Sequence, residues 1–405
     1  MAIDNKDKKI LNVPHLRFPE FSGEWEMVSL QDIATINPKS DPLQNTFIYI
    51  DLEAVEKGEL RKIQEIMREE APSRAQRVID NNDILFQCVR PYQKNNYIHR
   101  ILNTSNQQWV ASTGYAQIRT TELPNYIYHL LNTDEFNRKV MVRCTGSSYP
   151  AINSEDLATI HLYYTPDKKE QLKISRLLDL LDKRIATQNK IIEKYESLIQ
   201  AMCDTLIESE QHKVELAFSD FGKSYSGLSG KSAEDFGEGC PYITYMNVYQ
   251  NQIINATNVG LVKINGAEQQ SVVHYGDILF TLSSETAEEV GIGAVYLGDT
   301  YPLYLNSFCF GIHIIDDNKI FPPFLAFYVS TKSFRKVVFP LAQGSTRFNL
   351  QKNDFMKKGF SFPTVERQRK IYSALKTYSD KLAVEKSIAK LLCKQKNHLL
   401  SKLFI

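Results

Sequence analysis

The chain has 405 residues, a formal net charge of +1, and hydrophobic and charged contents of 43% and 23%. Its length exceeds what one ordinary hydrophobic core can hold and predicts two or three domains of a soluble globular protein. The balanced charge excludes a uniformly basic nucleic-acid binder, so local patches are the remaining electrostatic route to nucleic acid.

No stretch approaches the roughly 18 apolar residues of a membrane span, and the polar residues 1–10 lack the apolar segment of a signal peptide. The six cysteines form no CxxC pair and no metal-site spacing with histidine, so reduced thiols and a cytoplasmic location are expected. They are Cys88, Cys144, Cys203, Cys240, Cys309 and Cys393.

After an N-terminal arm over residues 1–26, residues 27–165 have the mixed pattern of a globular domain. Runs of β-branched and aromatic residues predict strands at 47–51 and 83–89. Short helices are predicted at 125–131 and 134–142.

A long central helix is predicted within residues 166–209, because residues 168–208 contain neither proline nor glycine. Its apolar residues recur at alternating steps of four and three, the pattern of a coiled-coil seam. Gln188 interrupts the seam, and a polar residue at such a position fixes register at a cost in stability. The seam and partner-docking candidates here are Leu178, Leu181, Ile185, Gln188 and Ile192.

Residues 210–362 form a second predicted globular domain. Strands are predicted at 278–282, 294–297 and 310–315, and helices at 324–329 and 332–338.

A second long helix is predicted within residues 363–405, and Glu385 interrupts its seam where Gln188 interrupts the first. Each helix of about 40 residues is roughly 60 Å long at 1.5 Å per residue, more than a half-chain globule can cover. Antiparallel pairing of the two helices is therefore favoured over the alternative, in which each lies on its own domain. The second set of seam candidates is Leu375, Tyr378, Leu382, Glu385 and Leu392.

The two halves repeat one another in order, which indicates a duplication. Asn82 to Phe86 returns as Gly276 to Phe280, and Gly146-Ser147-Ser148 returns as Gly344-Ser345-Thr346. The segment from Pro166 to Ile174 likewise returns as Pro363 to Ile371. The predicted fold class is α+β, with two repeated α/β domains, an antiparallel coiled coil and pseudo-twofold symmetry.

Several loops carry the residue types that contact nucleic acid. Arginine and asparagine bond base edges, while serine, threonine and lysine hold phosphates. For any single residue a solvated loop is the plainer interpretation, since loops are polar by default. The DNA-binding candidates are Arg90, Tyr92, Lys94, Asn95, Ser147, Ser148, Tyr149, Ser229, Lys231, Ser345, Thr346 and Arg347.

Motifs for catalysis are missing. There is no P-loop, no Gly-x-Ser-x-Gly elbow and no His-x-x-x-His metal pattern, so neither catalytic nor metal residues are predicted. Phe321-Pro322-Pro323-Phe324 approaches the Asn/Asp-Pro-Pro-aromatic site of DNA methyltransferases. Phe321 stands where an amide or carboxylate is needed, so the segment is interpreted as a loop entering a helix.

The arrangement resembles the specificity subunit of type I restriction–modification systems over essentially the whole chain. The resemblance rests on Leu16 to Phe21 with Trp25, on the duplicated Asp-Ile-Leu-Phe strand and Gly-Ser-Ser/Thr loop, and on the two helix beginnings at Pro166 and Pro363. The second helix carries Arg367-Gln368 where the family usually has Glu-Gln.

The resemblance implies a non-catalytic subunit whose two target-recognition domains each read one half of a split, asymmetric DNA sequence. The helices would set the unspecified gap and dock two methyltransferase subunits, with motor-nuclease subunits joining for restriction. S-adenosylmethionine would lie on the methyltransferases, ATP and Mg²⁺ on the motor-nucleases, and no cofactor on this chain.

Two other classes of function remain open from the residues alone. The near-neutral charge favours a protein scaffold that ignores DNA, and a free-standing nuclease or methyltransferase is disfavoured by the missing motifs.

Overall fold

The computed structural model describes residues 12–100, 107–266 and 268–405, so the segment for which a signal peptide was excluded lies outside it. The chain divides into two compact units, one formed by Met1–Asn189 with Ser387–Ile405 and the other by Lys190–Lys386. In the described part of the chain, no helix has the length and apolar character needed to cross a membrane. The boundaries between the units fall inside both long helices, whereas the division predicted from the sequence makes each helix a segment of its own.

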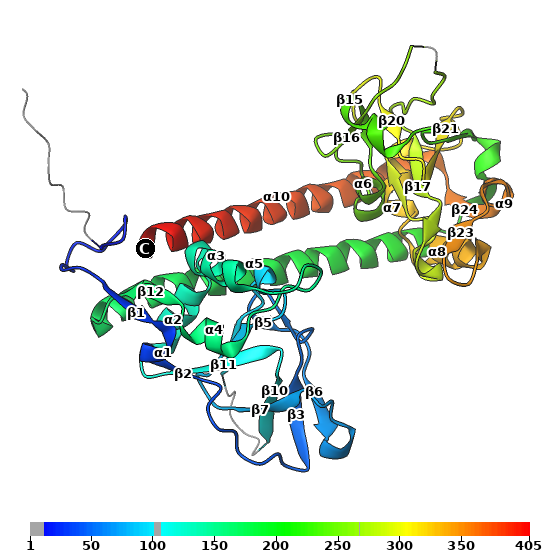
Figure 1. Ribbon diagram of the computed structural model, residues 1–405. Coiled ribbons are helices and arrows are strands. Elements are labelled where there is room, and N and C mark those ends of the chain that lie inside the picture. The colour runs from blue at the N-terminus through cyan, green and yellow to red at the C-terminus, as the bar shows by residue number, and fades with distance from the viewer. Residues whose placement is uncertain (1–11, 101–106, 267) are drawn as a thin grey trace, which may run out of the picture. The chain divides into compact units, whose positions relative to one another are not determined.

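The first unit carries a four-stranded sheet in the order β2-β11-β8-β9 and another in the order β6-β3-β10-β7. Figure 1 shows the second of these sheets on the side of the unit away from helix α5. The strands β1 and β12 pair antiparallel, and β4 pairs with β5. The strands are β1 Glu26–Ser29, β2 Ala34–Ile36, β3 Thr46–Ile50, β4 Val55–Glu56, β5 Glu59–Leu60, β6 Gln64–Met67, β7 Ala75–Ile79, β8 Ile84–Gln87, β9 Tyr97–Ile98, β10 Gln108–Ser112, β11 Tyr115–Thr120 and β12 His161–Tyr164. The short helices are α1 Leu30–Ile33, α2 Pro124–Leu131, α3 Asp134–Arg143 and α4 Ser154–Ala158.

The second unit carries sheets in the orders β14-β21-β17-β19, β16-β15-β20 and β18-β23-β22, with β13 paired to β24. Its strands are β13 Lys213–Ala217, β14 Gly222–Ser226, β15 Phe236–Ile243, β16 Gly260–Val262, β17 Ile278–Thr281, β18 Ser283–Ser284, β19 Gly293–Val295, β20 Tyr304–Leu305, β21 Cys309–Ile314, β22 Ala342–Gln343, β23 Phe348–Leu350 and β24 Gly359–Pro363. Its short helices are α6 Tyr245–Gln250, α7 Pro322–Tyr328, α8 Lys332–Val338 and α9 Lys352–Lys357.

The two units share part of their sheet topology. The order β2-β11-β8-β9 in the first corresponds to β14-β21-β17-β19 in the second, and the parallel pair β3–β10 corresponds to the parallel pair β15–β20. The predicted strands and short helices are confirmed to within a few residues at their ends. Helix α7 begins at Pro322, as expected for a loop that enters a helix there.

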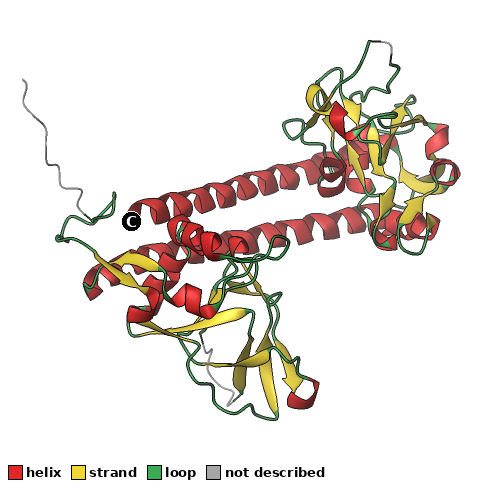
Figure 2. Cartoon of the chain, in the orientation of Figure 1, coloured by secondary structure: helices red, strands yellow, loops and turns green. Residues whose placement is uncertain are grey.

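The two long helices, α5 Lys168–Glu208 and α10 Val365–Leu403, are the longest helices in Figure 2. Each contributes residues to both hydrophobic cores. The beginning of α5 and the end of α10 lie in the core of the first unit, and the end of α5 and the beginning of α10 lie in that of the second. This arrangement is antiparallel, so the predicted fold class of mixed domains with paired long helices is confirmed. The core residues from these helices are Ile174, Leu178, Leu181, Leu400 and Leu403 in the first unit, and Ile199, Cys203, Ile207, Ile371 and Leu375 in the second.

A fully buried glutamine fastens each long helix to the short helix beside it. Gln171 accepts a hydrogen bond from the backbone N–H of Leu123 at 3.2 Å and donates one to the carbonyl of Thr165 at 2.8 Å. Gln368 likewise accepts from Phe321 N–H at 2.8 Å and donates to the Pro363 carbonyl at 2.8 Å. In each unit, one side-chain amide thus forms hydrogen bonds both to a backbone N–H at the start of the short helix (α2 or α7) and to a backbone carbonyl just before the long helix.

Residues 16–25 attach the N-terminal arm to the same helices in the first unit. The Leu16 N–H donates to the Lys402 carbonyl near the end of α10 at 2.8 Å. The Lys173 ammonium lies 4.6 Å from the centre of the Phe18 ring. Trp25 is 2% exposed and packs edge-on against Phe404. The arm motif that marks the family resemblance is therefore a set of contacts to α5 and α10.

At the beginning of the second long helix, Arg367 stands where the first has Glu170, so the charge at this position is reversed. In the first unit Glu170 on α5 accepts from Arg17 Nε at 2.7 Å, and Glu170 is fully buried. In the second unit Arg367 holds the equivalent helix position and donates to Glu210 at 2.6 Å. Both partners have changed sign together, so an ion pair is present at this position in each unit.

We expect Gln171→Leu and Gln368→Leu each to lower the free energy of unfolding by about 1–3 kcal/mol, because the leucine keeps the bulk but leaves buried backbone groups unpaired. Urea denaturation followed by circular dichroism measures the change. The exposed Gln395→Leu on α10 is the control, and equal loss in all three variants would contradict this role.

Reversing one charge, as in Glu170→Arg, should cost about 3–5 kcal/mol, since a buried charge then faces Arg17 without compensation. The double change Arg17→Glu with Glu170→Arg recreates the second unit's arrangement and should recover most of that loss. Chemical denaturation of the two single variants and the double variant measures the coupling. Glu366→Lys in the exposed pair with Lys370 is the control, expected to change stability by about 1 kcal/mol or less. Additive losses in the double variant would refute the pairing.

Candidate nucleic-acid interface

Each unit joins the end of its Asp-Ile-Leu-Phe strand to its Gly-Ser loop in the same way. After β8, Val89 bridges Ala151, which also bridges Thr145. After β17, strand β18 pairs with β23, which pairs with β22. The Gly-Ser loop thus lies at the tip of a small hairpin beside the strand end in both units.

Glycine is required at the start of each loop. Gly146 has φ +91°, and a Cβ there would lie 2.9 Å from the Tyr149 carbonyl oxygen. Gly344 has φ +134°, and its Cβ would lie 2.1 Å from the Arg347 carbonyl oxygen. Side chains are strained at such φ values and would clash with the returning chain. The turn therefore presents the three residues that follow each glycine, and these are exposed.

In the first unit the loop borders a surface hollow. Arg90 and Tyr149 are among its lining residues, and the Arg90 guanidinium lies 4.3 Å from the centre of the Tyr149 ring. Tyr149 is 65% exposed, so its ring presents a free face with a fixed cation beside it. The hollow is lined by Leu52, Glu53, Val55, Glu56, Arg61, Arg74, Gln87, Val89, Arg90, Gln93, Asn95 and Tyr149.

The predicted residues of the first unit divide into exposed and structural ones. Ser147, Ser148 and Tyr92 are exposed to solvent. Lys94 is held by Asp134 at 2.6 Å and by the Asn132 carbonyl. Asn95 accepts from the backbone of Lys57 and donates its own N–H to Gln87. Lys94 and Asn95 therefore fix the loop conformation, whereas the exposed residues can meet a partner.

In the second unit an equivalent hollow lies beside β18 and the Gly344 loop. Arg347 occupies the loop position that Tyr149 has in the first unit, and it is exposed. The hollow is lined by Tyr245, Met246, Tyr249, Ser283, Ser284, Glu285, Glu289, Phe308 and Arg347.

The other predicted residues of the second unit lie outside this lining. Ser345 and Thr346 are exposed at the loop tip, beside Arg347. Ser229 exchanges backbone hydrogen bonds with the Gln270 side chain. Lys231 pairs with Glu268 at 2.5 Å, and its side chain is only 4% exposed. Arg347, Ser345 and Thr346 are thus brought together, while Ser229 and Lys231 belong to a separate loop.

Sequence reasoning missed the aromatic wall of the second hollow. Tyr245 and Tyr249 stack with ring centres 5.9 Å apart, and Phe308 is 56% exposed. The Tyr249 hydroxyl donates to Glu289 at 2.7 Å, and this bond lowers the pKa of the carboxyl. Burial raises the pKa of Tyr245, whose hydroxyl donates to the Ser283 carbonyl. The spacing of two tyrosines four residues apart was the available signal.

The seam candidates are buried to different degrees. Leu178 and Leu375 are fully buried and Leu181, Gln188 and Leu392 nearly so. Ile185, Ile192, Leu382 and Glu385 are half-buried, and Tyr378 is 37% exposed.

Similarity to known proteins identifies the family of this chain. The sequence model of the type I restriction modification DNA specificity domain matches residues 22–197 and again residues 219–392. The chain belongs to this family. The duplication inferred from the sequence coincides with the two matches, and the predicted identity as a type I specificity subunit, a non-catalytic class, is confirmed.

A curated relative of the type I specificity family is the specificity subunit of the type I restriction enzyme HindI from Haemophilus influenzae, which is 24% identical over 186 residues. That match covers 45% of this chain and 37% of the relative, so it spans little more than a third of the relative's length.

Two solved structures share the fold over nearly the whole chain. One is a chain from a structure of complex assembly and conformational transition in a type I restriction–modification system, with TM-score 0.55 and 19% identity over 94% of this chain and 97% of that one. The other is a type I S subunit from M. genitalium, with TM-score 0.54 and 16% identity over 97% and 99%.

Proposed function

We propose that this chain reads an interrupted, asymmetric DNA sequence for a type I restriction–modification enzyme, each unit recognising one half. The observation that supports this proposal is that each unit has a hollow at the equivalent place. The two hollows are built from equivalent elements but lined by different side chains. Equivalent frames with different linings favour two readers of different sequence.

The linings suit base edges better than phosphates. Each lining contains both arginine and carboxylates. The first has Arg90 with Glu53 and Glu56, and the second has Arg347 with Glu285 and Glu289. Arginine matches the two acceptors of guanine and carboxylates accept from the cytosine amino group, whereas a phosphate site would be purely cationic. The exposed Tyr149 and Phe308 add apolar contacts of the kind that thymine methyl groups make.

In this proposal the long helices set the gap between the half-sites and dock two methyltransferase subunits that bind S-adenosylmethionine, while motor-nuclease subunits join for restriction. Helix α5 runs without interruption through 41 residues and α10 through 39, so both are suited to act as rigid spacers. Docking is supported by leucines that face away from the cores, namely Leu172, Leu180 and Leu391, which are 56%, 57% and 65% exposed.

Mapping DNA methylation in cells that express this subunit with its partners tests the two-reader proposal. We expect one split motif in wild type, and a relaxed first or second half in Arg90→Ala or Arg347→Ala respectively, since a lost base contact costs about 1–3 kcal/mol. Arg138→Ala, on the exposed side of α3, is the control. A single contiguous motif, or both arginine variants affecting the same half, would refute the proposal.

Inserting one matched heptad into each helix, after Asn189 in α5 and after Lys386 in α10, tests the spacer role. Seven residues add about 10 Å of helix, so the gap in the methylated motif should grow by roughly three base pairs at 3.4 Å each. An insertion in α5 alone, which breaks the pairing register, should abolish methylation. An active double insertion with an unchanged gap would contradict this role.

A further inference from the structure

The aspartate that begins the Asp-Ile-Leu-Phe motif is buried in both units, but the side chain paired with it differs between them. Asp83 accepts from Arg119 Nε at 2.9 Å and from a terminal nitrogen of the same guanidinium at 2.7 Å. Because arginine stays charged at all relevant pH values, this carboxylate is permanently neutralised. The first unit therefore needs no further cation here.

The second unit has histidine where the first has this arginine. Ile118 faces Ile84 across β11 and β8, as Ile312 faces Ile278 across β21 and β17. The residue after each isoleucine is Arg119 in one unit and His313 in the other, so the two positions are equivalent. Buried Asp277 therefore lacks the guanidinium that Asp83 has.

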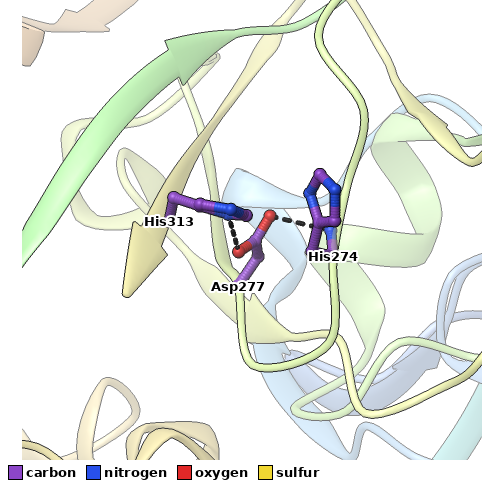
Figure 3. A group of neighbouring side chains, drawn as sticks. All are labelled: His274, Asp277 and His313. Carbon is purple, nitrogen blue, oxygen red and sulfur yellow. Dashed lines mark hydrogen bonds and ion pairs between the residues drawn. The ribbon is translucent and has the colours of Figure 1, made fainter. Parts of the chain in front are cut away.

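A second histidine lies beside the first, as Figure 3 shows. The rings of His274 and His313 are 4.6 Å apart between centres, and His313 Nδ1 lies 2.5 Å from Asp277 Oδ1. One ligand atom from each of the three residues lies within 4.8 Å of the others. The residues are 39 positions apart in sequence at most, which is why no sequence motif revealed them.

We propose that His274, Asp277 and His313 bind one divalent transition-metal ion of the zinc class, with water as the fourth ligand. This site is independent of the proposed DNA-reading function.

The donor set and spacing fit such an ion. Two imidazoles and a carboxylate suit Zn²⁺, Co²⁺ or Ni²⁺ and not Mg²⁺ or Ca²⁺, which take oxygen ligands. Zinc–ligand bonds of about 2.0–2.1 Å put two ligands of a tetrahedral ion roughly 3.4 Å apart, so the three donor atoms would move by about 1 Å from their present spacing to bind it. The exposed His274 leaves room for water.

The surroundings support the carboxylate as a ligand. The Tyr225 hydroxyl donates to Asp277 Oδ2 at 2.6 Å, and the His274 backbone N–H donates to the same oxygen at 3.0 Å. These bonds orient the carboxylate so that its other oxygen faces the histidines, as outer hydrogen bonds do at metal sites. The ion would tie β21 to the turn before β17, and β14 would be joined to the site through the Tyr225–Asp277 hydrogen bond.

The test is zinc titration of the full chain after chelator treatment, followed by calorimetry and by metal analysis after dialysis. We expect one zinc per chain and a raised unfolding temperature with zinc. His274→Gln should weaken zinc binding at least tenfold. The decisive variant is His313→Arg, which installs the first unit's ion pair: it should fold without metal and lose both the binding and the zinc-dependent rise.

Two controls keep the result specific. All six cysteines remain in these variants, so zinc held by thiols appears equally in each. His398→Gln removes an exposed histidine on α10 and should bind like wild type. Four-coordinate Co²⁺ absorption in wild type but not in His313→Arg would support the site. Equal zinc binding by wild type and His313→Arg, or none by wild type, would overturn it and leave a plain His–Asp hydrogen bond.

Discussion

The structure depends on two long helices, each of which has one end buried in the core of the first unit and the other end in the core of the second. Helix α5 places Leu178 in the first core and Cys203 in the second, and α10 does the same in reverse with Leu375 and Leu400. A buried leucine contributes about 1.5–3 kcal/mol, so each helix is fastened at both ends. The first unit includes Ser387–Ile405, a stretch distant in sequence from the rest of it, whereas the second unit is the continuous segment Lys190–Lys386. The unit boundaries fall inside the long helices because each unit takes in one end of each helix.

The interactions that fasten these helices are local to each unit and occur in both. Gln171 and Gln368 satisfy equivalent backbone groups with the same amide. The ion pair of Arg17 with Glu170 is preserved as a pair in which Glu210 and Arg367 have exchanged signs. A buried charge without its partner is costly, so a change at one member is tolerated only with a change at the other. Both units therefore keep the same contacts at the beginnings of the long helices, although the residues that form the ion pair differ.

The sequence predicted the frame well because helix seams and strand runs are periodic, and period depends only on local geometry. The candidate recognition residues were harder to judge. Arg90 and Tyr149 remain predictions, and the contact between them was not foreseen. Nothing in the sequence around Lys231 shows that Glu268 neutralises it. The partner of a charged loop residue is set by tertiary contacts between segments that the sequence does not align.

The partners of the two buried aspartates could not be predicted from the sequence either. Once the strand register is known, the repeat shows which residues of the two units are equivalent. Asp83 and Asp277 are both 1% exposed, so each carboxylate needs compensation. The compensating side chain comes from the neighbouring strand, and a single position on that strand decides between arginine and histidine. One unit thus places an arginine beside its carboxylate and the other a histidine. Divergence within a duplicated frame can change the chemistry of a buried site without moving any strand.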